Sequence, residues 1–169
     1  MIKKSLLTIS ALTLGLNIFS VSSSHAATGN ASANIVSAAT VQEALGGGLN
    51  FGDIIVGSSL SKVYSDGTVT NGGDAVVNGT PQHGQFEISN VTVDDKINIV
   101  VDETVTLYDG SNNSMTADLF VNDTGSNTTT ITATNTLQNF EIQGELTVPA
   151  SQASGDYTGT YEVVAYFLN

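Results

Sequence analysis

Residues 86–108 read FEISNVTVDDKINIVVDETVTLY, and this stretch decides the fold class. Apolar and polar side chains alternate in Phe86-Glu87-Ile88-Ser89, the pattern breaks at Asp94-Asp95, and a second β-branched run follows. A period of two residues is typical of a strand with one buried face, and adjacent aspartates are typical of the turn between two strands. The pattern predicts strands at 86–89, 97–101 and 105–108.

The rest of the chain repeats this order of short strands and turns. Asp109–Asn113 is a dense cluster of turn-forming residues. Further β-branched and aromatic runs lie at 117–121, 129–134, 140–148 and 157–168. Strands at this spacing predict an all-β fold, either a sandwich of antiparallel sheets or one closed antiparallel sheet. Val41–Leu45 is the one helix-like stretch, a single turn at most.

The N-terminus has the three parts of a secretion signal. Lys3-Lys4 gives a positive start, and Leu6–Phe19 is mostly apolar but shorter than the ~20 residues that a membrane-spanning helix needs. Small residues, Ser24 and Ala26, occupy the positions that signal peptidase reads before a cut after Ala26. We therefore expect a signal peptide at 1–26 and export. No later stretch is long and apolar enough to cross a bilayer as a helix, so we expect no membrane insertion.

Charge and cysteine content exclude several classes of function. The chain has 16 acidic residues, 4 basic residues and no cysteine. Loss of the signal removes two of the four lysines and leaves Lys62 and Lys96. An acidic surface repels phosphate backbones and anionic lipid, so we expect no nucleic-acid binding. Without cysteine the protein has no disulfide and no cysteine-linked lipid, so any attachment to a cell surface is non-covalent.

Few residues are suited to catalysis or to metal binding. His83 is the only histidine after the signal, and no Gly-x-Ser-x-Gly turn presents a nucleophilic serine. Adjacent acids such as Asp94-Asp95 point to opposite faces of a strand and do not converge on one substrate. Asp109, Ser111 and Asn113 have the alternate spacing of a calcium loop, but they lack its glycine and its distant glutamate. We expect no enzymatic activity, no cofactor and no metal site.

The first segment after the signal differs from the rest of the chain. From residue 31 to residue 41, small apolar residues alternate with polar ones, and a flexible break at Gly46–Gly48 follows. This pattern fits the first strand of the domain's own sheet, and it also fits an extension that pairs with a neighbouring subunit. We divide the chain into a signal at 1–26, an extension with a glycine hinge at 27–48 and a β-sandwich domain at 49–169.

Two stretches resemble a known family. Residues 49–57 read LNFGDIIVG, and residues 144–166 read GELTVPASQASGDYTGTYEVVAY. Together they resemble the secreted bacterial family called domain of unknown function 4402, whose members carry an LNFG box, an ending of this form and a signal peptide. The second stretch also resembles the ending of chaperone–usher pilus subunits, including the archaic type related to spore coat protein U. The resemblance implies an immunoglobulin-like, pilin-like antiparallel β-sandwich with an N-terminal strand extension.

A pilin-like fold implies a way for subunits to assemble. Such a domain lacks one strand, and a neighbour's N-terminal extension fills the open apolar groove by strand addition. The inserted face of this chain would then consist of Ala31, Ala33, Ile35, Ala39 and Val41. The implied partners are further copies or other pilus subunits, with a periplasmic chaperone and an outer-membrane usher. Archaic pilins often have a cysteine pair, which this chain lacks.

We therefore expect a secreted structural surface protein, a pilus or fimbria-type subunit that passes through the periplasm to the cell surface. The alternative is a free-standing secreted β-sandwich that binds carbohydrate or adheres to a host surface. For Tyr157 and Tyr161 the sequence favours packing in the core over a sugar-binding face. It also predicts that Phe51 lies in the core and that Gly159 marks a bulge or a close backbone approach.

Overall fold

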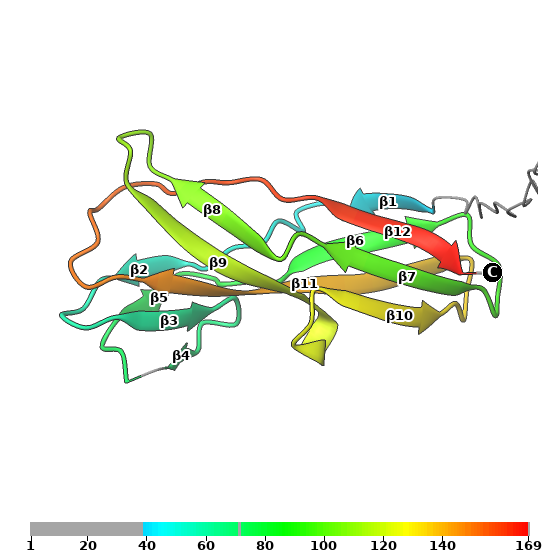
Figure 1. Cartoon of the computed structure of the whole chain (residues 1–169), viewed down its shortest axis with the longest axis horizontal. Coiled ribbons are helices and arrows are strands. Elements are labelled where there is room, and N and C mark those ends of the chain that lie inside the picture. Colours follow the sequence, from blue (N-terminus) through cyan, green and yellow to red (C-terminus); the bar gives the residue numbers. More distant parts are fainter. Residues whose placement is uncertain (1–38, 71, 169) are drawn as a thin grey trace, which may run out of the picture. The chain divides into compact units, whose positions relative to one another are not determined.

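The computed structural model describes residues 39–70 and 72–168, which form an antiparallel all-β domain (Figure 1). Its strands are β1 (Thr40–Glu43), β2 (Asp53–Ile55), β3 (Ser61–Tyr64), β4 (Val69–Thr70), β5 (Val76–Asn78), β6 (Gly84–Ser89), β7 (Lys96–Val101), β8 (Thr104–Tyr108), β9 (Ser114–Val121), β10 (Thr128–Thr132), β11 (Leu137–Val148) and β12 (Val163–Leu168). The helical structure within these ranges is a single 3-10 turn, η1 (Asn122–Thr124). The predicted all-β class is confirmed.

The larger sheet is organised around β11, its longest strand. β6 pairs with the first half of β11 and β3 with the second half, along the same edge. β9 pairs with the opposite edge, since Ile142 and Glu145 each have a partner on both sides. The outer positions belong to β1 beside β6, β4 beside β3 and β8 beside β9.

The second sheet has β7 at its centre, with β10 on one edge and β12 on the other. β7 leads directly into β8 of the larger sheet, so the chain changes sheets at residues 102–103. The segment before β12 follows the same path, because Tyr108 and Thr158 exchange two backbone hydrogen bonds of 2.9 and 3.0 Å. β2 and β5 form a separate two-stranded ribbon.

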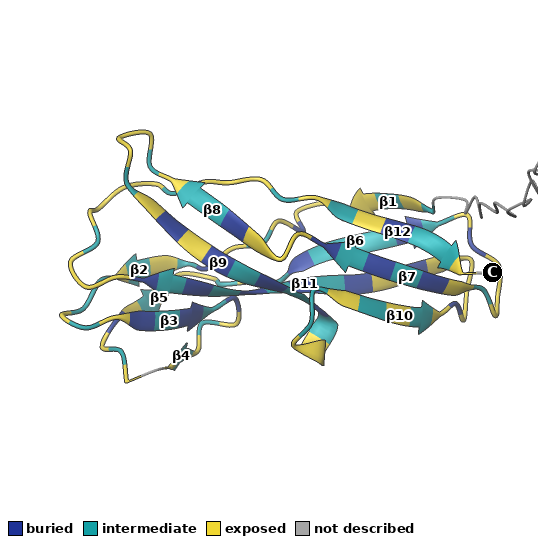
Figure 2. Cartoon of the chain, viewed as in Figure 1, coloured by how far each residue is buried: buried dark blue, intermediate teal, exposed yellow. Residues whose placement is uncertain are grey.

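One apolar core lies between the sheets. Its members come from alternate positions, as in β11, where even-numbered residues from Gln138 to Val148 are buried and the residues between them are more exposed (Figure 2). The largest fully buried apolar side chains are Ile88, Ile97, Ile99, Leu119, Ile142 and Leu146. The chain therefore uses the period of two that the sequence shows, with one face of each sheet turned inward.

Most of the expected strands are present, and the differences have local causes. Val41–Leu45 does not form the expected helical turn, because residues 40–43 pair with β6 and Val41 packs against the core. Of the strand expected at 157–168, only the part from Val163 onward pairs in a sheet ladder. Gly159 and its neighbours lie against β8 instead. The turn at Asp109–Asn113 is present: the Asp109 carboxylate accepts hydrogen bonds from the backbone N–H groups of residues 111 and 113.

The expected signal at 1–26 and most of the expected extension at 27–48 lie outside the described residues. The described part of that extension is not separate from the domain, since β1 is one strand of the larger sheet. In residues 39–70 and 72–168, no helix has the length and hydropathy to span a membrane.

Candidate functional site

Two outer strands, one from each sheet, meet at one corner of the sandwich. The Ala39 N–H, just before β1, donates a 3.0 Å hydrogen bond to the carbonyl oxygen of Ala165 in β12. The described residues of β1 and β12 share no other backbone hydrogen bond. Among the described residues, a single backbone bond therefore closes the sandwich at this corner, and a gap lies beside it.

The backbone of the C-terminal strand presents unpaired groups to this gap. The carbonyl oxygens of Thr158 and Glu162 accept bonds from Tyr108 and Asp102, on the β7–β8 side. Backbone groups of successive strand residues point to opposite edges. The odd-numbered residues between Thr158 and Glu162 and in β12 therefore turn their N–H and C=O groups toward the gap. Tyr161 and Val163 are two of these residues. No described residue bonds to them there.

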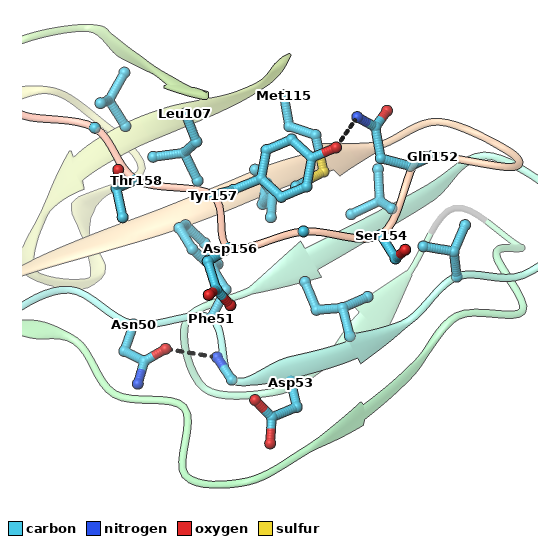
Figure 3. A pocket seen from close by; sticks show the side chains of 18 of the residues that line it. Asn50, Phe51, Asp53, Leu107, Met115, Gln152, Ser154, Asp156, Tyr157 and Thr158 are labelled. Atoms are coloured by element: carbon cyan, nitrogen blue, oxygen red, sulfur yellow. Dashed lines mark hydrogen bonds between the residues drawn. The ribbon is translucent and has the colours of Figure 1, made fainter. Parts of the chain in front are cut away.

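A cleft of about 750 Å³ lies along the segment that leads into β12, and Tyr161 is among the residues that line it. One wall is the chain segment 49–56, which includes β2, and the other is the segment 152–159 that leads toward β12 (Figure 3). The floor is apolar and comes from β8, β9 and the end of β11. Its residues are Val105, Leu107, Met115, Leu146 and Val148. The two walls correspond to the two stretches that carry the family resemblance.

Phe51 anchors the first wall, as the sequence predicts. Its side chain is 7% exposed, and the Asn50 carboxamide oxygen accepts a 2.9 Å hydrogen bond from the Gly52 N–H, which shapes the turn around it (Figure 3). Gly52 has a φ of +78°, a conformation that glycine adopts without strain. Gly144 of β11 leaves room for the phenyl ring, because a Cβ atom there would lie 2.6 Å from Phe51 Cζ. The two family stretches therefore pack directly against each other.

Tyr157 anchors the second wall. Its hydroxyl accepts a 2.8 Å hydrogen bond from the Gln152 side chain and donates one of 2.9 Å to the Ala153 carbonyl (Figure 3). Two residues later, a Cβ atom at Gly159 would lie 2.5 Å from the Thr106 carbonyl oxygen, so only glycine lets this segment lie so close to β8. The predicted close approach at Gly159 is confirmed. Tyr157 is half-buried against the core, as the sequence favoured.

Electrostatics at the cleft suit an uncharged occupant. Asp53 and Asp156 are exposed at its walls, while none of the described residues that line it is basic. Burial raises the pKa of Tyr161 to about 12, and the nearby charge of Glu43 adds to the rise. The phenol therefore stays neutral at physiological pH. An anionic ligand would face two carboxylates here without a compensating cation.

The predicted donor-strand residues fall into two groups. Ala31, Ala33 and Ile35 lie outside the described residues. Ala39 and Val41 are at the start of the domain, where they are half-buried against the core of their own chain. At these two positions the contacts are within one chain, which is one of the two alternatives that the sequence allowed. The walls and floor of the cleft were not predicted as a site.

Other polar groups, which the sequence analysis considered for catalysis or metal binding, have hydrogen-bond partners within the structure. The His83 imidazole Nδ1 lies 2.7 Å from the hydroxyl of Ser65, and that hydroxyl also accepts a 3.0 Å bond from the Gly144 N–H. Ser65 is 1% exposed, so its hydroxyl is buried. The Asp109 carboxylate is engaged within its turn. In the described part of the chain, no three His, Asp or Glu side chains are placed to share a metal ion.

Comparison with known families gives one match. The profile of the family described as "Domain of unknown function (DUF4402)" matches residues 40–167, which begins with β1 and ends in β12. The chain belongs to this family. Comparison with curated proteins found no significant match.

Proposed function

We propose that this member of the DUF4402 family is an exported structural surface protein, a pilus or fimbria-type subunit whose copies assemble by strand addition. The cleft between residues 49–56 and 152–159 is the acceptor, and the N-terminal segment of a neighbouring copy is the donor. The carrying observation is that this cleft has an apolar floor and that the segment leading into β12 beside it has backbone groups unpaired by any described residue.

The acceptor has both features that strand addition requires. Backbone groups along the edge of β12 and its lead-in provide hydrogen bonds, each with a net value of about 0.5–1.5 kcal/mol. The apolar floor takes alternate side chains of an extended segment. Leu107 and Met115 lie in this floor and are turned toward the cleft (Figure 3).

The donor in this proposal is residues 27–38. Ala39 and Val41 pack within their own domain, so the inserted face is reduced to Ala31, Ala33 and Ile35. A fully extended segment of this length reaches roughly 40 Å, which is longer than the wall formed by residues 49–56. Ile35 is the largest side chain of the inserted face and is the natural anchor for the apolar floor.

The position of the first described residue favours assembly between copies. Figure 1 has β1 beside the first half of β12 at one end of the domain, and β2 with the loop before β12 at the other. A segment that leaves one domain at Ala39 and enters the cleft of the next links copies head to tail. Such a heterologous contact produces a fibre when the rotation between successive copies does not close into a ring.

A sugar-binding module is less well supported. Binding modules of that kind present aromatic faces to solvent. Tyr108 is the one aromatic residue in the exposed class among the described residues, at 56% exposure, and it stands alone near a turn. Transit through the periplasm, a chaperone and an usher belong to this proposal as the route by which a fibre subunit reaches the surface.

Truncation tests the proposal. We expect the chain from residue 27 to form a ladder of oligomers on unheated gels and in size-exclusion chromatography with light scattering. The chain from residue 39 should be a monomer that binds a synthetic peptide of residues 27–38. If the longer chain is a monomer with the same unfolding midpoint as the shorter one, the proposal is wrong.

A pair of substitutions in the donor provides the matched control. Ile35→Asp places a charge on the inserted face and should abolish the ladder, because a carboxylate is not stable in an apolar floor without a partner. Val36→Asp makes the same change in charge on the opposite face and should leave the ladder intact. Equal effects of the two variants would contradict an inserted strand.

A further inference from the structure

A second open backbone edge belongs to β10. It lies on the opposite side of the three-stranded sheet from β12. The strand pairs with β7 on one edge only. Asn127 accepts a 2.9 Å bond from Val101 on the β7 side, so odd-numbered residues of β10 point their backbone groups to β7. The even-numbered residues, Thr128, Thr130 and Thr132, point theirs outward. No described residue forms a backbone hydrogen bond with them on that side.

Two other outer strands, β4 and β8, are protected against pairing with a second chain. β4 is only two residues long. The outer edge of β8 is covered by the segment around Thr158. β10 has neither protection, and it also lacks the lysine, proline or bulge that usually guards an exposed edge. Its sequence, TTTIT, is made entirely of β-branched residues, which favour extended structure.

Charge distribution favours contact between two copies at this edge. Residues 124–140 contain no charged side chain, in a chain with 16 acidic and 4 basic residues. Two copies of so acidic a protein repel each other over most of their surface, and a neutral edge is where approach costs least. The occupant that these observations favour is therefore a second copy of the same strand.

The edge of β10 is complementary to itself in an antiparallel arrangement. With Thr130 opposite Thr130 of the second copy, Thr128 lies opposite Thr132, and all three residues present outward backbone groups. The Thr128 N–H is already bonded to the Ser126 hydroxyl at 3.3 Å, so four new backbone bonds form without disturbing it. The exposed threonine side chains then lie opposite one another on the solvent face, a favourable cross-strand pair.

We propose that β10 is a lateral self-association surface, at which two copies pair antiparallel about Thr130 and join their three-stranded sheets into one of six strands. This contact is isologous and closes on itself. It adds a side-by-side contact to the end-to-end assembly proposed above, and it does not depend on the cleft or on the N-terminal segment.

A cysteine placed at the centre of the strand tests the proposal, because the chain has no cysteine of its own. Opposed residues of a hydrogen-bonded pair have Cα atoms about 5.5 Å apart, a separation that a disulfide spans. We expect Thr130→Cys to yield a disulfide-linked dimer under mild oxidation. Thr116→Cys is the control, since it is exposed on β9 but has paired strands on both sides.

The experiment is made in the chain from residue 27 that also carries Ile35→Asp, so that end-to-end assembly and lateral pairing are read separately. A dimer for Thr130→Cys and none for Thr116→Cys supports the lateral contact. Equal cross-linking of the two variants, or none, overturns it. Neither result changes the conclusion about the cleft.

A charge at the same position gives a second test without cross-linking. Thr130→Lys places two ammonium groups opposite each other across the pair, so the lateral dimer measured by sedimentation should be lost. Thr116→Lys makes the same change in net charge and should leave the dimer intact. If both variants dissociate the dimer equally, or neither does, the contact is not at β10.

Discussion

Gly144 shows at the level of a single residue why the two family stretches occur together. Phe51 of the first stretch fills the space above Gly144 of the second, and the Ser65 hydroxyl caps the Gly144 N–H from the other side. The sequence predicts that Phe51 is buried, which is confirmed, but it does not predict a partner so distant in sequence. The role of Gly144 becomes visible only once β11 and the segment 49–52 are placed in space.

We expect Gly144→Ala to lower the free energy of unfolding by about 1–3 kcal/mol, because the new methyl group overlaps the Phe51 ring. Urea unfolding followed by circular dichroism measures the change. Adding Phe51→Leu, which withdraws the ring atoms in question, should restore part of the loss. If the double variant is destabilised by the sum of the two single effects, the two residues are not coupled as described.

Asp74 makes the stability depend on pH. Hydrogen bonds from the Ser59 hydroxyl, the Ser58 N–H and hydroxyl, and the Ser59 N–H hold the pKa of Asp74 well below its usual range. A carboxyl group with a lowered pKa in the folded state stabilises the fold above its unfolded pKa of about 3.9. That stabilisation is lost as the pH falls from there toward the folded pKa.

Asp74→Asn should therefore lower the melting temperature most at neutral pH, and the difference from the unchanged chain should shrink as the pH falls below about 4. Thermal melts at several pH values measure this difference. Glu103→Gln, the control, makes the same change in charge at an exposed position. A difference between Asp74→Asn and the unchanged chain that stays constant down to pH 2 would contradict the argument.

At the level of elements, the sequence predicts most of the ladder strands and is least informative at the edges of the sheets. β6, β7, β9 and β11 carry a clear alternation because one face of each is buried. The helical turn predicted at Val41–Leu45 is wrong, because residues 40–43 form β1. Only Val41 of its four residues is even half-buried, so a period of two is hardly visible in it. Pairing with β6 decides its conformation instead.

The lead-in to β12 depends on Gly159. We expect Gly159→Ala to destabilise the fold by about 1–3 kcal/mol, because its methyl group would collide with the backbone carbonyl of Thr106, which cannot turn away as a side chain can. Amide hydrogen exchange should show faster exchange at Tyr108 and Thr158, whose backbone bonds join the two segments. Gly48→Ala is the control, since its methyl group would meet only the flexible Glu43 carboxylate. Equal stability losses in the two variants would contradict this role.

At the level of the whole molecule, the sequence predicts the fold class, which is confirmed, but not the position of the cleft. Composition and alternation are sufficient for the all-β class, and the scarcity of reactive side chains directs attention to surface and assembly. The cleft depends on how two segments distant in the sequence, residues 49–56 and 152–159, face each other across the apolar floor. Alternation within single strands contains no information on that arrangement.

The central claim is that residues 27–38 of one copy lie in the cleft of another. Cross-linking between two single-cysteine chains tests it most directly: one chain carries Ile35→Cys, and the other, with a tag of different mass, carries Leu107→Cys in the cleft floor. A disulfide between the two chains can form only in trans, because each has a single cysteine. We predict a mixed dimer for this pair. We predict none when Val36→Cys takes the place of Ile35→Cys, or when the exposed Val93→Cys takes the place of Leu107→Cys. Mixed dimers at equal yield in all combinations, or in none, would contradict the account.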